Sequence, residues 1–359
     1  MFTELTPTAR RTWRLIQLAV LALGLAIWLA LMFRPPVGLH AFWNVLIPVA
    51  PALVAVAPGL WRNICPLAST ALLPRHLGLS RRIKLSSRGQ DLLALFGLAA
   101  LLLIVPLRHV VLDLNGPATA LTIALLAALA VPLGLTFEWK SGWCSGACPV
   151  HPVEKLYGTR PALVLDNAHC TSCEHCSDPC PDSTEAMTPL KNNGARLRPY
   201  LGTLLVGGFP GYIWGWFQVP DYAGASGWEH TPQAYAWPFG CLAISLAVYL
   251  LAGRLLAVNP EQGPDEAGAS AGSQRGEFLA RLFACAAIAC YYYYRLPALF
   301  GFGPFPGDGM LVDLREVLPA GFPVLSRVLT SGLCLWWFLL RQRAGGTPRT
   351  WSRRPAFSN

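Results

Sequence analysis

The sequence predicts an all-α polytopic membrane protein, and its composition and its apolar pattern both support that prediction. Of its 359 residues, 53% are hydrophobic and only 13% are charged, whereas a soluble domain carries about 25% charged residues. The mean hydropathy of +0.42 agrees with this difference. Apolar runs of about 20 residues, the length that crosses a bilayer as a helix, recur between short polar loops. We therefore expect about eight transmembrane helices.

The sequence does not mark all eight spans equally clearly. The segment 200–220 is the weakest, because it contains several glycines and Pro210, and 277–300 carries an arginine near each end. Glycine and proline are tolerated in membrane helices when neighbouring groups satisfy the freed backbone. The expected spans lie near residues 15–33, 41–60, 91–112, 118–137, 200–220, 234–257, 277–300 and 323–340.

The basic residues indicate how the chain is oriented. The net charge of +9 does not point to a nucleic-acid partner, because the charges lie in short loops and form no basic stripe. If the N-terminus is cytoplasmic, most of the 28 Lys and Arg residues fall in inside segments, as the positive-inside rule requires. We expect a multi-pass protein of a bacterial cytoplasmic membrane with both termini in the cytoplasm. The apolar run after Arg14 is too long for a signal peptide and lacks a cleavage site, so we expect it to be retained.

The eleven cysteines fall into two groups. Four lie inside apolar runs, where a free cysteine packs as a small hydrophobic residue. Seven lie in or beside polar loops on the expected cytoplasmic side, where disulfides are rare and metal or redox roles are the default. These seven are Cys65, Cys144, Cys148, Cys170, Cys173, Cys176 and Cys180.

The strongest motif is a run of four cysteines at residues 170–181, which reads C-x2-C-x2-C-x3-C-P. This is the spacing of bacterial ferredoxins, in which one loop wraps a [4Fe–4S] cluster. A zinc site needs only two close cysteine pairs and explains neither the third and fourth cysteines nor the proline. We expect a cytoplasmic ferredoxin-like 4Fe–4S loop, with flanking His169 and His175 exposed. Its ligands would be Cys170, Cys173, Cys176 and Cys180, the last of which can serve another cluster in two-cluster ferredoxins.

A second group of cysteines follows two of the spans. Cys144 and Cys148 form C-x3-C-P where the fourth span ends, and Cys65 precedes a proline at the matching place after the second span. We expect Cys148 at a helix N-cap, a position that lowers a thiol pKa and favours metal binding. With seven thiolates, two all-cysteine cubanes are one ligand short. A second site at Cys65, Cys144 and Cys148 would use a non-cysteine ligand, His151 being nearest in sequence, or hold a three-iron centre. The alternative is a redox-inert turn that packs against the first cluster.

These features divide the chain into three parts. Residues 1–140 would hold transmembrane helices 1–4, and residues 141–199 the cytoplasmic iron–sulfur segment. Residues 200–359 would hold transmembrane helices 5–8 and a cytoplasmic tail. Charges at mid-span are almost absent, which disfavours a transporter with a structural cluster. A bis-histidine haem is also disfavoured, because His109 has no partner histidine on a facing span.

Over residues 41–200 the chain resembles the NapH/NosR-type membrane ferredoxins. The resemblance is carried by the C-x3-C-P motifs at the membrane exits and the four-cysteine run that follows them. It implies an electron-transfer protein that takes electrons from quinol and delivers them to a redox partner protein or subunit. The chain departs from the family in having one ferredoxin run instead of two, in the loss of the first cysteine of one C-x3-C-P, and in lacking a large extracytoplasmic domain.

The sequence therefore favours an electron relay between the quinone pool and a partner protein, as the membrane component of a quinol-linked oxidoreductase. Its cofactors would be one [4Fe–4S] cluster, a candidate second cluster, and quinone. The alternative is a redox assembly or regulatory factor for a metalloenzyme, acting in metal reduction or oxidase maturation, which the resemblance also includes.

Overall fold

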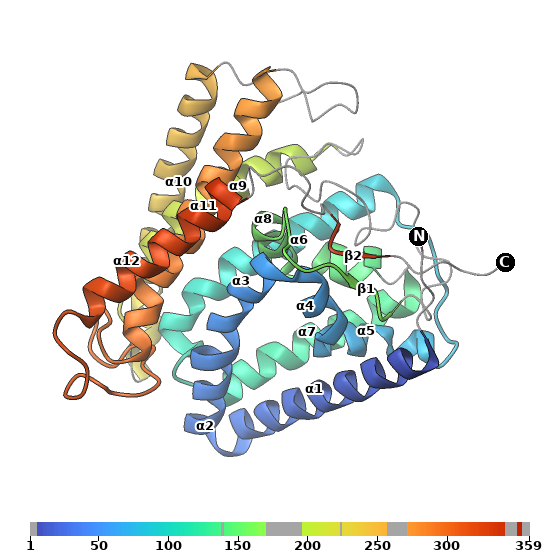
Figure 1. Cartoon of the computed structure of the whole chain (residues 1–359). Helices are drawn as coiled ribbons and strands as arrows, with labels where there is room; N and C mark the ends of the chain where they lie inside the picture. Colours follow the sequence, from blue (N-terminus) through green and yellow to red (C-terminus); the bar gives the residue numbers. More distant parts are fainter. Residues whose placement is uncertain are drawn as a thin grey trace.

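The computed structural model describes residues 6–137, 140–169, 196–222, 225–256, 271–341 and 350–353. Within these residues the chain is almost entirely helical, and the only sheet among them is one pair of two-residue strands. Figure 1 shows long helices around the molecule and several short helices near the two strands.

Long helices alternate with short ones along the chain. The first half of the chain holds α1 (Pro7–Phe33), α2 (Pro35–Leu39), η1 (His40–Leu46), α3 (Ile47–Val56), α4 (Pro58–Ile64), α5 (Pro66–His76), α6 (Ser87–Leu107), η2 (Arg108–Leu112), α7 (Gly116–Thr136), η3 (Lys140–Ala147), α8 (His151–Tyr157) and β1 (Leu165–Asp166). The second half holds α9 (Arg198–Trp216), η5 (Ala225–His230), α10 (Thr231–Leu255), α11 (Ala271–Leu299), α12 (Phe322–Leu335), η6 (Trp336–Leu340) and β2 (Ser352–Arg353).

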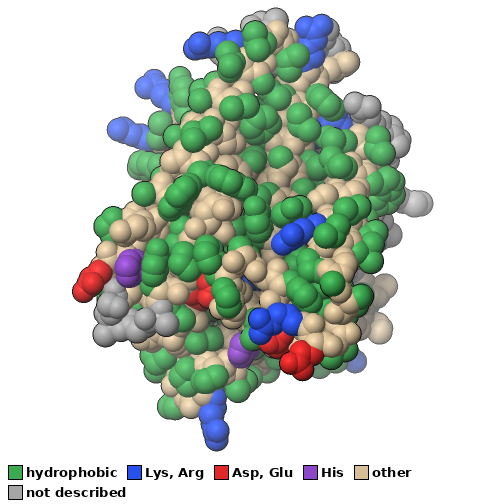
Figure 2. All heavy atoms as spheres, turned by 90° about the vertical axis from the view of Figure 1, so that its left-hand side faces the viewer, with side chains coloured by type: hydrophobic (Ala, Val, Ile, Leu, Met, Phe, Trp, Pro, Cys, Tyr) green, Lys and Arg blue, Asp and Glu red, His purple; other side chains and the backbone are tan. Residues whose placement is uncertain are grey.

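Six helices of the described part are long and apolar enough to cross a membrane. Their outer surfaces are rich in exposed leucine and valine, such as Leu251 and Val328, and Figure 2 shows hydrophobic side chains over much of one face. The predicted all-α multi-pass membrane class is confirmed at this level. The six candidate spans are Pro7–Phe33, Pro35–Val56, Ser87–Leu112, Gly116–Thr136, Gly227–Leu255 and Phe322–Leu340.

Helix α9 occupies the weakest of the expected spans and is not among those six, nor is α11. Its glycines let α10 pack very closely: a Cβ at Gly207 would lie 2.8 Å from the Tyr249 side chain, and one at Gly208 would lie 2.7 Å from that of Leu242. Small residues at such interfaces are typical of membrane bundles. The low hydropathy of α9 therefore reflects a helix covered largely by protein, with most of its residues buried.

The chain departs from the expected helix boundaries near the cysteines. The second span ends at Val56, and the separate helix α4 begins at Pro58, a residue that suits the first turn of a helix. Cys65 then caps the N-terminus of α5, in line with the Cys-Pro pattern. Cys148, by contrast, follows the π-helix η3, and α8 begins at His151 with Val150 as its N-cap. The expected N-cap position of Cys148 is therefore wrong.

Candidate functional site

The ligand run Cys170, Cys173, Cys176 and Cys180 lies outside the described residues, but the structure shows what holds both of its flanks. On the N-terminal side, the Asn63 side chain donates to the Asp166 carbonyl (3.0 Å) and accepts from the Ala168 amide (3.1 Å). On the C-terminal side, the amides of Arg196 and Leu197 donate to Asp91 at 3.0 and 3.2 Å. Both flanks are thus tied to helix ends, that of α4 on one side and that of α6 on the other.

His169, the residue directly before the run, was expected to be exposed, and this is wrong. Its exposed fraction is only 4%. It lies in the segment that Asn63 anchors, and its own amide donates to the Asn167 side chain at 3.0 Å. The chain therefore enters the four-cysteine run from a buried position. His175, the other flanking histidine, lies outside the described residues.

The structure brings Cys65, Cys144 and Cys148 together, as the equivalent exits of the second and fourth spans predict. All three lie in one small apolar cluster with Trp143 and residues of α5. Arg62 links the two exits, because its Nη1 donates to the Cys144 carbonyl at 3.0 Å and its Nη2 donates to the Ser145 hydroxyl at 3.1 Å.

The thiols of Cys65 and Cys148 do not have the lowered pKa that would favour metal binding. Burial raises the pKa of the Cys65 thiol and raises that of Cys148 well above its ordinary value, and nearby Glu154 adds to both shifts. The lowered pKa expected for Cys148 is therefore wrong, because burial outweighs the backbone hydrogen bond from Val150. Among the described residues, no three His, Cys, Asp or Glu side chains are placed to hold a metal ion. Metal binding here would require deprotonation and a rearrangement of the thiols.

A charged triad that the sequence did not reveal lies beside these cysteines. Arg62 Nη1 donates to Glu154 Oε2 at 2.5 Å, and His151 Nδ1 lies 3.1 Å from the same oxygen. All three residues are at most 4% exposed. Burial would raise the pKa of Glu154, but Arg62 and His151 together hold it below its ordinary value. The buried carboxylate is thus ionised and paired, as a buried charge has to be.

The triad fixes the protonation of His151. Burial lowers the pKa of His151 to about 4, so the ring is neutral at pH 7, and its Nδ1–H donates to Glu154. Its Nε2 then carries a lone pair, and that atom finds no partner among the described residues. Ligating histidines usually have their other ring nitrogen bonded to a carboxylate in this way. His151 therefore has the right protonation for the non-cysteine ligand that the sequence suggested.

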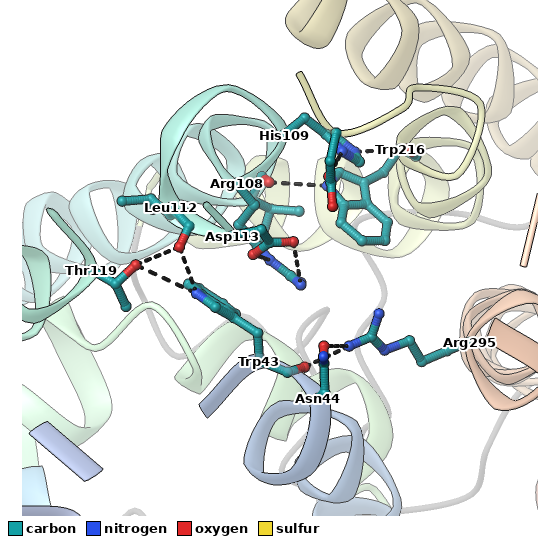
Figure 3. Close-up of polar contacts among 11 residues, drawn as sticks. Trp43, Asn44, Arg108, His109, Leu112, Asp113, Thr119, Trp216 and Arg295 are labelled. Carbon is teal, nitrogen blue, oxygen red and sulfur yellow. Dashed lines mark hydrogen bonds and ion pairs between the residues drawn. The ribbon is translucent and has the colours of Figure 1, made fainter. Parts of the chain in front are cut away.

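A second polar network lies at the opposite ends of the spans (Figure 3). The guanidinium of Arg108 is sandwiched between Trp43 and Trp216, at 4.2 and 4.7 Å from the ring centroids, and forms two bonds with Asp113 at 2.8 and 3.0 Å. Arg295 of α11 donates to the Trp43 carbonyl at 2.6 Å. The network joins η1, η2, α9 and α11, so it links the two halves of the chain at this end.

His109 extends this network to the loop after α9. Its Nδ1 lies 2.6 Å from Asp221 and its Nε2 lies 3.0 Å from the Trp216 carbonyl. Because the carbonyl can only accept, Nε2 donates to it, and Nδ1 faces the Asp221 carboxyl group. Both ring nitrogens are therefore engaged, and neither is free for a haem iron.

The His109 pair borders a small cavity of about 20 Å³, room for about one water molecule. Asp221 and Asp308 line it, and the Asp221 amide donates to Asp308 at 2.8 Å. Burial and the neighbouring Asp221 raise the pKa of Asp308 to about 6. The network could have been suspected from Arg108 and Asp113 at one span end, but its partners come from distant segments that the sequence does not connect.

No protein-family model, curated protein or solved structure matches this chain. The resemblance to NapH/NosR-type proteins therefore rests on the cysteine motifs alone.

Proposed function

We propose that this protein is a membrane-bound iron–sulfur electron carrier that relays electrons between the quinone pool and a partner redox protein. The observation that carries the proposal is the four-cysteine run between two segments that are both hydrogen-bonded to helix ends, at Asn63 of α4 and Asp91 of α6. Cys170, Cys173, Cys176 and Cys180 would hold one [4Fe–4S] cluster at the membrane surface. A loop fixed at both ends gives such a cluster a defined distance from the bilayer.

The protein would supply position and electrostatics for this relay. A [4Fe–4S] cluster supplies one-electron chemistry, so the two electrons released with two protons when a quinol becomes a quinone would pass to the partner in two successive transfers. The buried charges of Arg62 and Glu154 compensate each other beside the cysteine cluster.

The direct test is to purify the protein in detergent without oxygen. It should be brown, contain about four irons per chain, and show a reduced-cluster signal in electron paramagnetic resonance after addition of a short-chain quinol. NADH, added as the control donor, should leave the signal absent. An iron-loaded protein that neither quinol reduces nor quinone oxidises would refute the quinone link. A well-folded protein that contains no iron after anaerobic reconstitution would refute the cluster itself.

We further propose eight spans, with α9 and α11 crossing the membrane beside the six apolar helices, and both termini in the cytoplasm. The close packing of α9 on α10 supports this count, because it places α9 inside the bundle. An odd number of spans would place the arginine-rich C-terminal tail on the opposite side from the basic N-terminus, against the positive-inside rule.

A reporter fused after Asn359 should therefore behave as cytoplasmic. Green fluorescent protein at this position should fluoresce, and alkaline phosphatase there should be inactive. The matched control is phosphatase fused after Gly307, in the loop between α11 and α12, which should be active. The opposite pattern at the two positions would overturn the orientation and would return disulfides to consideration for the loop cysteines.

The candidate second site is tested by counting iron. If Cys65, Cys144, Cys148 and His151 hold a second cluster, the protein should contain about eight irons, and Cys148→Ser should lose about four of them while the first cluster's signal persists. Cys334→Ser, a buried cysteine in the helical bundle, is the matched control and should lose none. Equal iron in Cys148→Ser and the parent would show that these thiols only pack.

A further inference from the structure

The C-terminal segment Thr350–Arg353 returns to the inner face and docks through Trp351. This side chain is completely buried. Its indole nitrogen donates to the Gly158 carbonyl at the end of α8 at 2.7 Å. Its ring lies edge-on to His151, with the centroids 6.0 Å apart, and 5.1 Å from the Arg62 guanidinium. A tryptophan from the end of the chain thus covers the triad beside the cysteines.

The surface that surrounds Trp351, here called the socket, contacts the backbone of this residue as well as its ring. The α-carbon of Gly59, in α4, lies directly against the Trp351 carbonyl, so that a Cβ at residue 59 would overlap it. The overlap is with backbone, which cannot rotate away as a flexible side chain would. Any larger residue at position 59 therefore has to displace the docked tail.

The same tail segment braces the chain just before the four-cysteine run. Strand β2 pairs in parallel with β1, with Leu165 opposite Ser352 and Asp166 opposite Arg353. Figure 1 shows the two strands side by side, although they come from distant parts of the colour scale. Because Asn63 bonds the Asp166 carbonyl, strand β1 is held between α4 and the tail. Cys170 follows β1 by only four residues.

We propose that Thr350–Arg353 is a strap that sets the position of the cluster-bearing run, with Trp351 as its positioning residue. The proposal rests on the proposed function, because it assigns the strap to the cluster that Cys170 would help to hold. Solvent exposure and hydrogen bonding are among the factors that set the potential of an iron–sulfur cluster. A strap that holds the entry of its binding loop against α4 and α8 would limit that exposure and keep the potential constant.

The proposal makes a prediction that does not require iron. In hydrogen–deuterium exchange on the full-length protein, the segment 161–169 should exchange about tenfold faster in Trp351→Ala than in the parent, because its strand pairing opens. Trp351→Phe keeps a ring but loses the bond to Gly158, and should give an intermediate rate. Gly59→Ala, which displaces the Trp351 backbone, should raise the exchange rate of this segment as much as Trp351→Ala does. Gly253→Ala is the control: Gly253 has open space around it, so the exchange rate should equal that of the parent.

The second readout is the cluster. In the iron-loaded protein, Trp351→Ala and Gly59→Ala should shift the midpoint potential and release iron to a ferrous chelator several-fold faster, while Gly253→Ala should not. Unchanged exchange in Trp351→Ala would overturn the strap whatever the iron content. Faster exchange with unchanged potential and iron release would show a tail that docks without positioning the cluster. Faster exchange in a protein that never binds iron would refute the proposed function but would still show that the strap stabilises strand β1.

Discussion

Replacing Cys173 by Ser should remove the main cluster. Cys173 is the second cysteine of the four-cysteine run and belongs to the first three, which ligate the same cluster whichever cluster the fourth serves. A serine oxygen is a poor substitute for thiolate sulfur, which is the ligand that iron–sulfur clusters select. We expect the loss of about four irons per chain and of the reduced-cluster signal in electron paramagnetic resonance. This is the largest expected effect on function, because all electron transfer would depend on that cluster.

The control for this variant has to separate ligation from packing. Cys285→Ser makes the same chemical change at a cysteine buried in the helical bundle, so it should keep its iron and its signal. Thermal unfolding of both variants in detergent should resemble that of the parent, because the helical bundle is unchanged. An unaltered spectrum in Cys173→Ser would withdraw the cluster from this loop and leave residues 170–181 without an assigned role.

Hydropathy predicted the class of fold because the bilayer imposes one strong constraint on every span, namely length with few charges. The hydropathy-based prediction of a span was weakest for α9, because α9 packs mainly against other helices. Gly207 and Gly208 lower the hydropathy of that segment and at the same time allow α10 to approach. Mean hydropathy over a sequence window cannot separate these two effects. It registers that glycine has no side chain, but it contains no information about the helix that packs against the glycine.

The proximity of the cysteines could be predicted, because a similar Cys-Pro pattern follows two of the spans. The contacts that tertiary packing creates between distant segments could not be predicted. The matching exits at Cys65 and Cys148 predicted that these thiols would be neighbours, and they are. The Arg62–Glu154 pair joins residues 92 positions apart, and no local pattern connects them. The pKa of Cys148 was mispredicted for a related reason, because burial, which is set by the tertiary fold, outweighs any effect of a helix end.

The second large effect is expected for stability, at Arg108. This guanidinium is 4% exposed and holds Asp113 through two bonds. Arg108→Ala would leave the largely buried Asp113 carboxylate without its partner and would empty the space between Trp43 and Trp216. Breaking a buried ion pair by removing one partner typically costs about 3–5 kcal/mol. Because the network joins the two halves of the chain, we expect a clear fall in the unfolding midpoint in detergent.

The chain contains a matched control for this experiment. Arg315 holds Asp313 through the same two-bond geometry, at 2.9 and 2.6 Å, but both side chains are largely exposed to solvent. Exposed pairs contribute little, so Arg315→Ala should leave the unfolding midpoint almost unchanged. Arg108→Lys, which keeps the charge but not the planar fork, should fall between the parent and Arg108→Ala.

A double variant tests whether the cost at Arg108 arises from the stranded carboxylate. Arg108→Ala combined with Asp113→Ala removes both charges, so it should be less destabilised than the sum of the two single variants, and the difference measures the coupling in the pair. Strict additivity would mean that Arg108 acts through its contacts with Trp43 and Trp216 alone. Equal midpoints for Arg108→Ala and Arg315→Ala would mean that burial adds nothing to this ion pair, contrary to the argument from Asp113.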